Sequence, residues 1–381
     1  MNNTLRHWRE AATLILAAGS HHGGSMSIMA SQLDQKKKVF DYEVLLLTRS
    51  QNSGFMPNAL VFPGGVVDAS DFSNDWMKIF ERHIKKPNFG LGVVKQSHIS
   101  RPPMFATDRV QFGSLIPGEV AFRICAIRET FEESGILLVV PENLDVDVNQ
   151  NFIKAYEENE EEVSRWREAV QNNPVQFIEM CKKLQCVPNI WALHEWDNWL
   201  TPTFSKNSKA RRFDTAFFVC CLPKKPVTKD DQKEVTSFQW ATPQETIEKY
   251  KSQATWLPPP QFYNLSRLCN FSSIQELHRF SCSRGLEGCE RWLPITVHAE
   301  NGVVHTLPGD ALYPEDPDVT GESGRIYSTD KTIEVLMEKG CSFHRFVVYD
   351  GVPNYYVNTQ PKYRHVNPIF PDIRAEPQSR L

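Results

Sequence analysis

The sequence lacks three features that would place it in a special class. No segment approaches the roughly eighteen consecutive apolar residues of a membrane span. Positive charge is not in excess, since the net charge is -4, and nucleic-acid binding normally requires a basic surface. The nine cysteines follow neither paired metal spacings nor a small secreted disulfide framework, so we interpret them as reduced thiols. We expect no membrane segment and no nucleic-acid partner.

The composition is that of a chain able to bury a large core. The 381 residues are 41% hydrophobic and 23% charged, which fits one elaborated domain or two.

The N-terminal stretch "LRHWREAATLILAAGS" has two interpretations. Basic residues, an apolar run and small residues at its end resemble a secretory signal. The run from Ala11 to Ala18 is short for a signal, however, and Glu10 interrupts the positive flank. A first core strand over Thr13 to Ala17 fits the same residues better.

The stretch "RETFEESG", residues 128–135, raises the main functional question. In a helix over 118–134, Glu129, Glu132 and Glu133 share one face, and like charges at this spacing destabilise a helix unless cations compensate them. The opposite face has an apolar stripe: Val120, Ile124, Ile127 and Phe131. Gly135 suits a C-terminal cap. A solvated acidic face and a divalent-metal site both fit this geometry.

The motif Arg-Glu-x-x-Glu-Glu-x-Gly decides between them. It resembles the second half of the signature of Nudix hydrolases, which cleave nucleoside diphosphates linked to another moiety. Arg128, Glu129, Glu132, Glu133 and Gly135 all match. At average residue frequencies, a chain of this length contains such a match by chance only about three times in ten thousand.

The first half of the signature lies further upstream than usual. Residues 62–71, "FPGGVVDASD", resemble its opening, and Gly65 followed after five residues by Asp71 keeps the spacing, with aspartate in place of glutamate. Residues 72–117 are then an insertion inside the motif, which adds little loop-closure entropy. We expect "NDWMKIFERHIKK" to form a short amphipathic helix and "RPPMF" to be extended. The insertion either covers the site as a lid or is inert.

The run just before the glycines, residues 45–65, resembles the coenzyme A signature of Nudix coenzyme A diphosphatases. Eight positions are in register: Leu45, Leu46, Arg49, Ser50, Phe62, Pro63, Gly64 and Gly65. Two depart, because Gly54 stands where that signature has arginine and Asn58 where it has glycine. Alone, Arg49 would be an ordinary surface arginine after a strand, but in this register its planar fork is expected to contact phosphate.

The chain stops at Ser379, Arg380 and Leu381, which resemble the serine-lysine-leucine peroxisomal address. Motif, coenzyme A-like run and tail together identify the chain as a member of the peroxisomal coenzyme A diphosphatases of the Nudix family. The resemblance covers roughly residues 11–250 plus the tail. It implies peroxisomal localisation, recognition by the import receptor through the three final residues, and control of peroxisomal coenzyme A levels.

The resemblance also implies a fold and a mechanism. The fold class is α+β: a Nudix α/β/α sandwich over residues 8–270, with the insertion at about 72–117 and a C-terminal α+β extension over 271–381. The substrate is coenzyme A or acyl-coenzyme A, cleaved to 3',5'-ADP and (acyl-)4'-phosphopantetheine. Mg²⁺ or Mn²⁺ is held by the three glutamates and the Gly65 carbonyl, and Arg128 orients the glutamates by ion pairing. Predicted coenzyme A contacts are Arg49, Ser50, Phe62, Gly64 and Gly65.

Other segments leave alternatives open. The basic loop from Lys206 to Arg212 serves either solubility or a phosphate such as the 3'-phosphate of coenzyme A. Glu195 and Glu234 are weak candidates for a further metal or base carboxylate. Residues 152–171 read as an acidic helix, and hairpins are expected about Asn301-Gly302 and Asp350-Gly351.

Two other functions remain open at this point. A Nudix hydrolase acting on NADH, ADP-ribose or capped RNA would keep the glutamates without needing residues 45–65. A non-catalytic coenzyme A-binding module would be expected to have lost some of them.

Overall fold

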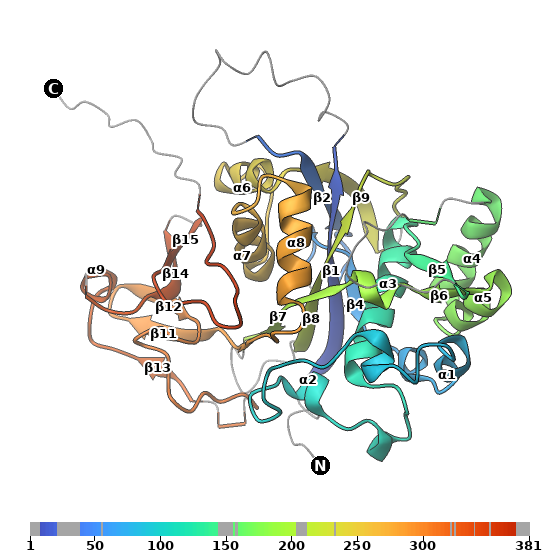
Figure 1. The fold of residues 1–381 in the computed structure, drawn as a ribbon. Coiled ribbons are helices and arrows are strands. Elements are labelled where there is room, and N and C mark those ends of the chain that lie inside the picture. Colours follow the sequence, from blue (N-terminus) through green and yellow to red (C-terminus); the bar gives the residue numbers. More distant parts are fainter. Residues whose placement is uncertain are drawn as a thin grey trace.

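A mixed β-sheet built around the N-terminal strand organises the fold (Figure 1). The computed structural model describes residues 8–20, 39–54, 56–143, 155–156, 159–202, 212–231, 234–320, 322–323, 325–338, 340–349 and 352–370. Within these residues the main sheet has eight strands: β1 (Arg9–Gly19), β2 (Tyr42–Arg49), β3 (Leu60–Val61), β4 (Gly64–Val66), β7 (His194–Leu200), β8 (Phe213–Leu222), β9 (Val235–Ala241) and β10 (Arg291–Trp292).

Strand β1 is the centre of this sheet. It pairs in parallel with β8, from Arg9 opposite Phe213 to Ala18 opposite Leu222. On its other side it pairs antiparallel with β2 and β4. The prediction of a strand over Thr13 to Ala17 is confirmed, and the strand extends further at both ends.

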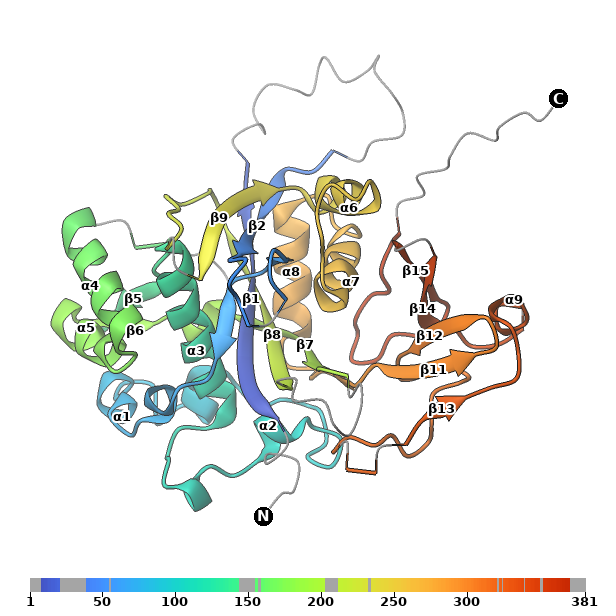
Figure 2. The same ribbon diagram turned by 180° about the vertical axis from the view of Figure 1, so that it is seen from behind.

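Helices cover both faces of the sheet (Figure 2). One face packs against α3 (Gly118–Ser134), and the other against α6 (Pro243–Lys251), α7 (Pro259–Leu268) and α8 (Ile274–Arg284). Alternate residues of β1 serve the two layers: Leu14 and Leu16 lie in the α3 core, and Ile15 and Ala17 in the other. The predicted α/β/α sandwich is confirmed.

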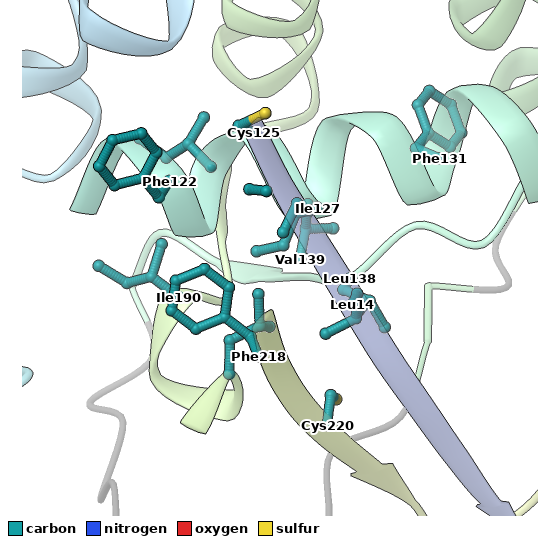
Figure 3. Packing of buried hydrophobic residues seen from close by; sticks show 14 of the residues in the cluster. Leu14, Phe122, Cys125, Ile127, Phe131, Leu138, Val139, Ile190, Phe218 and Cys220 are labelled. Atoms are coloured by element: carbon teal, nitrogen blue, oxygen red, sulfur yellow. The ribbon is translucent and has the colours of Figure 1, made fainter. Parts of the chain in front are cut away.

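Helix α3 has the predicted bounds but is more buried than its apolar stripe indicates. It follows Pro117 and ends at Gly135, whose φ of 74° allows its N–H to cap the Phe131 carbonyl at 2.9 Å. Side chains all around the helix are buried, and Phe122, Ile127 and Phe131 belong with Leu14 and Phe218 to one buried cluster (Figure 3). The expectation of a polar face opposite an apolar one is therefore wrong for most of the helix length.

The insertion forms one-turn helices that contribute to the α3 core. After η3 (Ala69–Phe72), which ends at the first residue of the insertion, its elements are α1 (Trp76–Ile79), η4 (Pro87–Gly90), α2 (Pro103–Ala106) and η5 (Val110–Phe112). Trp76, Phe80 and Met104 are at most 1% exposed, and the indole of Trp76 lies 5.9 Å from the ring of Phe177. The segment is therefore part of the packed core, and its role as a lid or as inert sequence stays open.

Two local predictions in the insertion are wrong. "RPPMF" is not extended, because Pro103 opens α2 and proline is favoured in a first helical turn. The amphipathic helix predicted over 74–86 is helical only in the single turn of α1, followed by turns.

A small layer of helices and one two-stranded sheet packs beside α3. It consists of β5 (Val139–Pro141), β6 (Cys186–Pro188), α4 (Glu160–Asn172), α5 (Gln176–Leu184) and η6 (Ile190–Ala192). Helix α4 covers the second half of the acidic helix predicted over 152–171; residues 152–154 and 157–158 of that prediction lie outside the described residues.

The C-terminal part has a sheet of its own. Within the described residues it contains β11 (Ile295–Ala299), β12 (Gly302–Thr306), β13 (Tyr327–Ser328), β14 (His344–Tyr349) and β15 (Val352–Val357), with α9 (Ile333–Leu336) against β12. Both predicted hairpins are present as antiparallel strand pairs, and residues 350–351, the predicted turn of the second, lie outside the described residues. The predicted boundary after residue 270 falls before α8 and β10, which both pack on the main sheet.

No helix in the described part of the chain has the length and apolar character needed to cross a membrane.

Candidate active site

The two halves of the split motif meet where β4 crosses α3. Gly64 and Gly65 pair with Thr13 and Ala12 of β1, which holds the glycine turn against the helix. The Gly64 N–H donates to Glu133 Oε2 at 2.8 Å. A Cβ on Gly64 would lie 2.7 Å from Thr13 Cα, and one on Gly65 would lie 2.5 Å from Glu129 Cδ. Glycine at position 64 therefore allows the turn to lie against β1, and glycine at position 65 allows it to approach the carboxylate of Glu129.

Arg128 is the hub of the charged cluster. Its Nε and Nη2 donate to the two carboxylate oxygens of Asp71, each at 2.9 Å. Its Nη1 donates to Glu129 at 2.8 Å and to Glu132 at 2.7 Å. Arg128 is 2% exposed, so these pairs are largely shielded from water. The expected ion pairing of Arg128 with the glutamates is present.

Asp71 holds Arg128 in place, a role that the spacing of the motif did not predict. It is 1% exposed and also accepts a hydrogen bond from the Asp68 N–H at 2.9 Å, closing the capping box that starts η3. The aspartate therefore fixes Arg128, and Arg128 in turn fixes two glutamates.

Burial raises the pKa of each glutamate in the cluster. For Glu129 the pKa rises to about 7, because burial outweighs the opposing charge of Arg128. Burial likewise raises the pKa of Glu132, again against Arg128. The pKa of Glu133 is raised well above its ordinary value by burial and by the charge of Glu129. Arg128 therefore opposes the rise in the pKa of Glu129 and Glu132 without cancelling the effect of burial.

These residues suit a hard divalent cation. The donors are carboxylate oxygens with a backbone carbonyl beside them, the ligands that such ions prefer. A divalent ion would also favour the charged form of the three carboxylates, whose pKa values burial raises. In the conformation described, Arg128 holds Glu129 and Glu132 while Gly64 holds Glu133, and their oxygens do not converge within 4.8 Å as a set of three. Ion binding therefore requires carboxylate rotation toward a common point.

The predicted coenzyme A contacts have different surroundings. Arg49 ends β2, donates to Ser53 Oγ from Nη2 at 2.9 Å, and its charge opposes the rise in the pKa of Glu133. The Ser50 N–H donates to the Glu234 carbonyl at 2.8 Å. Arg49 is therefore near enough to act on Glu133, and the ligand contacts of Arg49 and Ser50 stay predictions.

The prediction that the side chain of Phe62 contacts coenzyme A is wrong. Phe62 is 2% exposed and packs in the core between the sheet and helices α6 to α8, so its side chain does not offer a ligand surface. The aromatic residue before Pro63 instead holds the start of the glycine turn in the core.

The two weaker candidates for a metal or base carboxylate, Glu195 and Glu234, have different surroundings. Glu234 is exposed, and its charge contributes to the raised pKa of Glu132 and Glu133, so it belongs to the neighbourhood of the site. Glu195 is 1% exposed and is held by both terminal nitrogens of Arg101 at 2.6 Å. That fork occupies both of its oxygens, which excludes Glu195 as a metal ligand or base in this arrangement.

Cys125 is a site neighbour that the sequence did not single out. It lies three residues before Arg128 on the same helix face, receives a hydrogen bond from Arg128 Nη2 at 3.7 Å, and contacts the Gly65 carbonyl at 3.9 Å. The i−3 spacing from Arg128 was the available signal. The basic loop at 206–211 and the tail at 379–381 lie outside the described residues.

Comparison with known proteins gives the family. A family model described as the NUDT19 Nudix domain matches residues 8–268, and one described as the NUDT19 C-terminal domain matches residues 296–358. The chain belongs to the NUDT19 family of Nudix hydrolases.

Relatives in this NUDT19 family align along almost their entire length. A protein of Xenopus laevis named acyl-coenzyme A diphosphatase NUDT19 is 59% identical, with 100% of both chains covered. Proteins of the same name from Gallus gallus and Homo sapiens are 50% and 43% identical, each with 97% of both chains covered. As a Nudix hydrolase of this family, the chain is expected to need a divalent metal ion.

Proposed function

We propose that this chain hydrolyses the diphosphate bond of coenzyme A and acyl-coenzyme A to 3',5'-ADP and 4'-phosphopantetheine or its acylated form. The observation that carries the proposal is the reassembled motif: despite the long insertion, Gly64 bonds Glu133 and Asp71 bonds Arg128. The full-length relatives named acyl-coenzyme A diphosphatase support this choice of substrate over other nucleoside diphosphates.

The residues of the site have three roles: some bind the metal ion, some orient these ligands, and one contacts the phosphates of the substrate. Glu129, Glu132 and Glu133, with the Gly65 carbonyl, would hold Mg²⁺ or Mn²⁺, which neutralises the diphosphate and lowers the pKa of a bound water. Arg128 sets the directions of Glu129 and Glu132 and is itself held by Asp71.

Glu133 is oriented by a backbone donor instead. The Gly64 N–H holds its Oε2, which leaves the other carboxylate oxygen for the ion. Arg49 stands at the end of β2, where a guanidinium can receive phosphate oxygens of the substrate.

We further propose that the chain works in the peroxisome, reached through its final residues Ser379, Arg380 and Leu381, and that it controls coenzyme A levels there. The import receptor would read these residues as an address.

The deciding experiment is product identification. Purified full-length protein with Mg²⁺ or Mn²⁺ is incubated separately with coenzyme A, an acyl-coenzyme A, NADH and ADP-ribose, and the products are identified by mass spectrometry. We expect 3',5'-ADP from the first two, complete loss with a chelator, and recovery when metal is restored. Cleavage of NADH or ADP-ribose alone would keep the Nudix site and overturn the substrate. Tight binding of coenzyme A without any cleavage would favour a non-catalytic module.

A further inference from the structure

A second cluster of potential metal ligands lies between strand β7 and helix α8. His194 begins β7, and His278 and Cys282 follow one another at i and i+4 on α8, where two side chains share a helix face. Within the described residues, this is the only trio of histidine, cysteine or acidic side chains whose ligand atoms all lie within 4.8 Å of one another.

The distances within the trio leave room for one ion. Cys282 Sγ is 3.3 Å from Nε2 of His194, and 3.6 Å and 3.8 Å from Nε2 and Nδ1 of His278. The two imidazole rings meet edge to face, with centroids 6.0 Å apart. Ligand atoms of a tetrahedral zinc ion, bound at about 2.0 Å for nitrogen and 2.3 Å for sulfur, are separated by similar distances.

The trio is separate from the glutamate cluster. His194 lies opposite Val219 of β8, whose side chain belongs to the core beneath α6, α7 and α8. Helix α3, which carries the glutamates, packs on the other face of the sheet. The two sites therefore lie in different layers of the sandwich, as Figure 1 shows for α3 and α8.

The surroundings fit ligand binding better than acid–base or nucleophilic work. Burial lowers the pKa of His194 to about 3 and also lowers that of His278, so both imidazoles are neutral, as metal ligands must be. Burial raises the pKa of Cys282 to about 11, so the free side chain is a neutral thiol that must lose its proton when it binds an ion. His194 is 9% exposed, whereas His278 and Cys282 are half-buried, which gives an ion a route from solvent.

We propose that His194, His278 and Cys282 bind one transition-metal ion of the zinc class, with the fourth position taken by water. Imidazole nitrogen and thiolate sulfur are the ligands that zinc prefers, whereas Mg²⁺ and Mn²⁺ prefer the oxygen ligands of the glutamate cluster. Binding converts the Cys282 thiol to a metal-bound thiolate and releases its proton to solvent. The ion would tie α8, which lies beyond the predicted Nudix boundary, to the main sheet.

Nearby positive charge makes the thiolate the decisive ligand. Arg123 and Arg284 both act on His194 and oppose a second cation there. Only Cys282 brings negative charge to the trio, so its loss should weaken binding more than the loss of His278.

Cobalt is the most direct probe, because a cysteine thiolate bound to Co²⁺ gives a charge-transfer absorption band that oxygen ligands do not. Reduced, chelator-stripped full-length protein is titrated with Co²⁺ and then with Zn²⁺. We expect a thiolate-to-cobalt band that saturates at one equivalent and disappears as Zn²⁺ displaces Co²⁺. Native mass spectrometry should show one tightly bound zinc ion.

Variants separate this site from the others. Cys282→Ser should abolish the band, and His278→Gln should weaken Co²⁺ binding by more than about 100-fold, because even outer-shell changes weaken metal binding by about 10 to 100-fold. Cys341→Ser removes an exposed cysteine elsewhere and should leave the band unchanged. Glu133→Gln should also leave it unchanged. Circular dichroism confirms folding of each variant.

Either of two results would overturn the proposal. One is the absence of a thiolate band in the wild-type protein. The other is a band of equal strength in the folded Cys282→Ser variant, which would assign the ion to another cysteine. Neither result depends on hydrolysis of coenzyme A, so this inference and the proposed function can fail separately.

Discussion

Arg128 and Asp71 are joined by two parallel hydrogen bonds of 2.9 Å although 57 positions separate them in the chain. Both side chains are at most 2% exposed. The pair bridges the insertion and reconnects the first half of the split motif with the second. Several expected outcomes depend on this relationship and on the contacts around it.

Asp71→Asn should damage both stability and catalysis. The variant leaves a buried arginine without its bidentate partner, and breaking such a pair destabilises a protein by about 3 to 5 kcal/mol. The remaining contacts of Arg128 with Glu129 and Glu132 favour the lower value. Urea unfolding measures the free energy, and steady-state kinetics should show a lower kcat. Asp75→Asn, at an exposed position that makes no side-chain cap, is the matched control. Equal stability of the two variants would contradict the anchoring role.

Glu133→Gln should abolish turnover while sparing coenzyme A binding. Its amide oxygen can still accept the Gly64 hydrogen bond, so the fold is kept, but the carboxylate charge that holds the metal is lost. A loss of several kcal/mol of transition-state stabilisation corresponds to about a 100-fold or larger fall in kcat. Calorimetry with coenzyme A measures the retained binding. Glu168→Gln, exposed on α4, should behave like the wild type. Unchanged turnover in Glu133→Gln would end the metal-site assignment.

Gly65→Ala should reduce activity far more than stability. The new methyl group meets the carboxylate of Glu129, a side chain that can rotate away, so destabilisation should stay near 1 kcal/mol. Displacing this carboxylate by about 1 Å should lower kcat by about 100-fold. Gly54→Ala is the control, since no atom lies within 4 Å of its Cβ position. A fully active Gly65→Ala would show that the close approach of β4 to Glu129 is not needed.

Arg101→Ala should destabilise the protein without altering its kinetics. Arg101, in the insertion, bonds both oxygens of the buried Glu195, and its loss leaves an unpaired carboxylate at an expected cost of about 3 to 5 kcal/mol. Thermal and urea unfolding measure the loss, and KM and kcat are compared at a temperature where the variant is folded. Arg82→Ala, exposed in the same insertion, should stay within about 0.5 kcal/mol of wild type. A selective rise in KM would instead indicate that the insertion contacts substrate.

Removing Leu381 should disperse the protein through the cytosol. The three final residues are expected to act as one receptor-read address, so the truncated chain should lose import while keeping its activity in vitro. Fluorescence microscopy of tagged chains, with the tag at the N-terminus, compares the two. Retained peroxisomal location would mean that the chain carries another signal.

The sequence predicted best what is encoded in short, fixed spacings. The bounds of α3 follow from its apolar period and from Gly135, and the hairpins follow from Asn-Gly and Asp-Gly turns. The glutamates and Arg128 were found because the motif places them within two turns of one helix.

Long-range partners were not predictable from these spacings. Nothing near Glu195 in the sequence indicates that Arg101 will neutralise it, because the contact depends on how the insertion folds against β7. Phe62 was predicted to contact ligand, since a motif position does not say which way a side chain turns. The burial of side chains from the insertion was not predicted, because one-turn helices carry too little periodicity to reveal a buried face.

The parallel pairing of β1 with β8 has a consequence for how the chain reaches its fold. The strand at the N-terminus finds its long partner, residues 213–222, only after more than half of the protein has been synthesised. Contacts of such large sequence separation slow folding, and until they form the apolar edge of β1 is exposed. During synthesis, this enzyme should therefore depend on chaperones that shield its first strand until the eighth has left the ribosome.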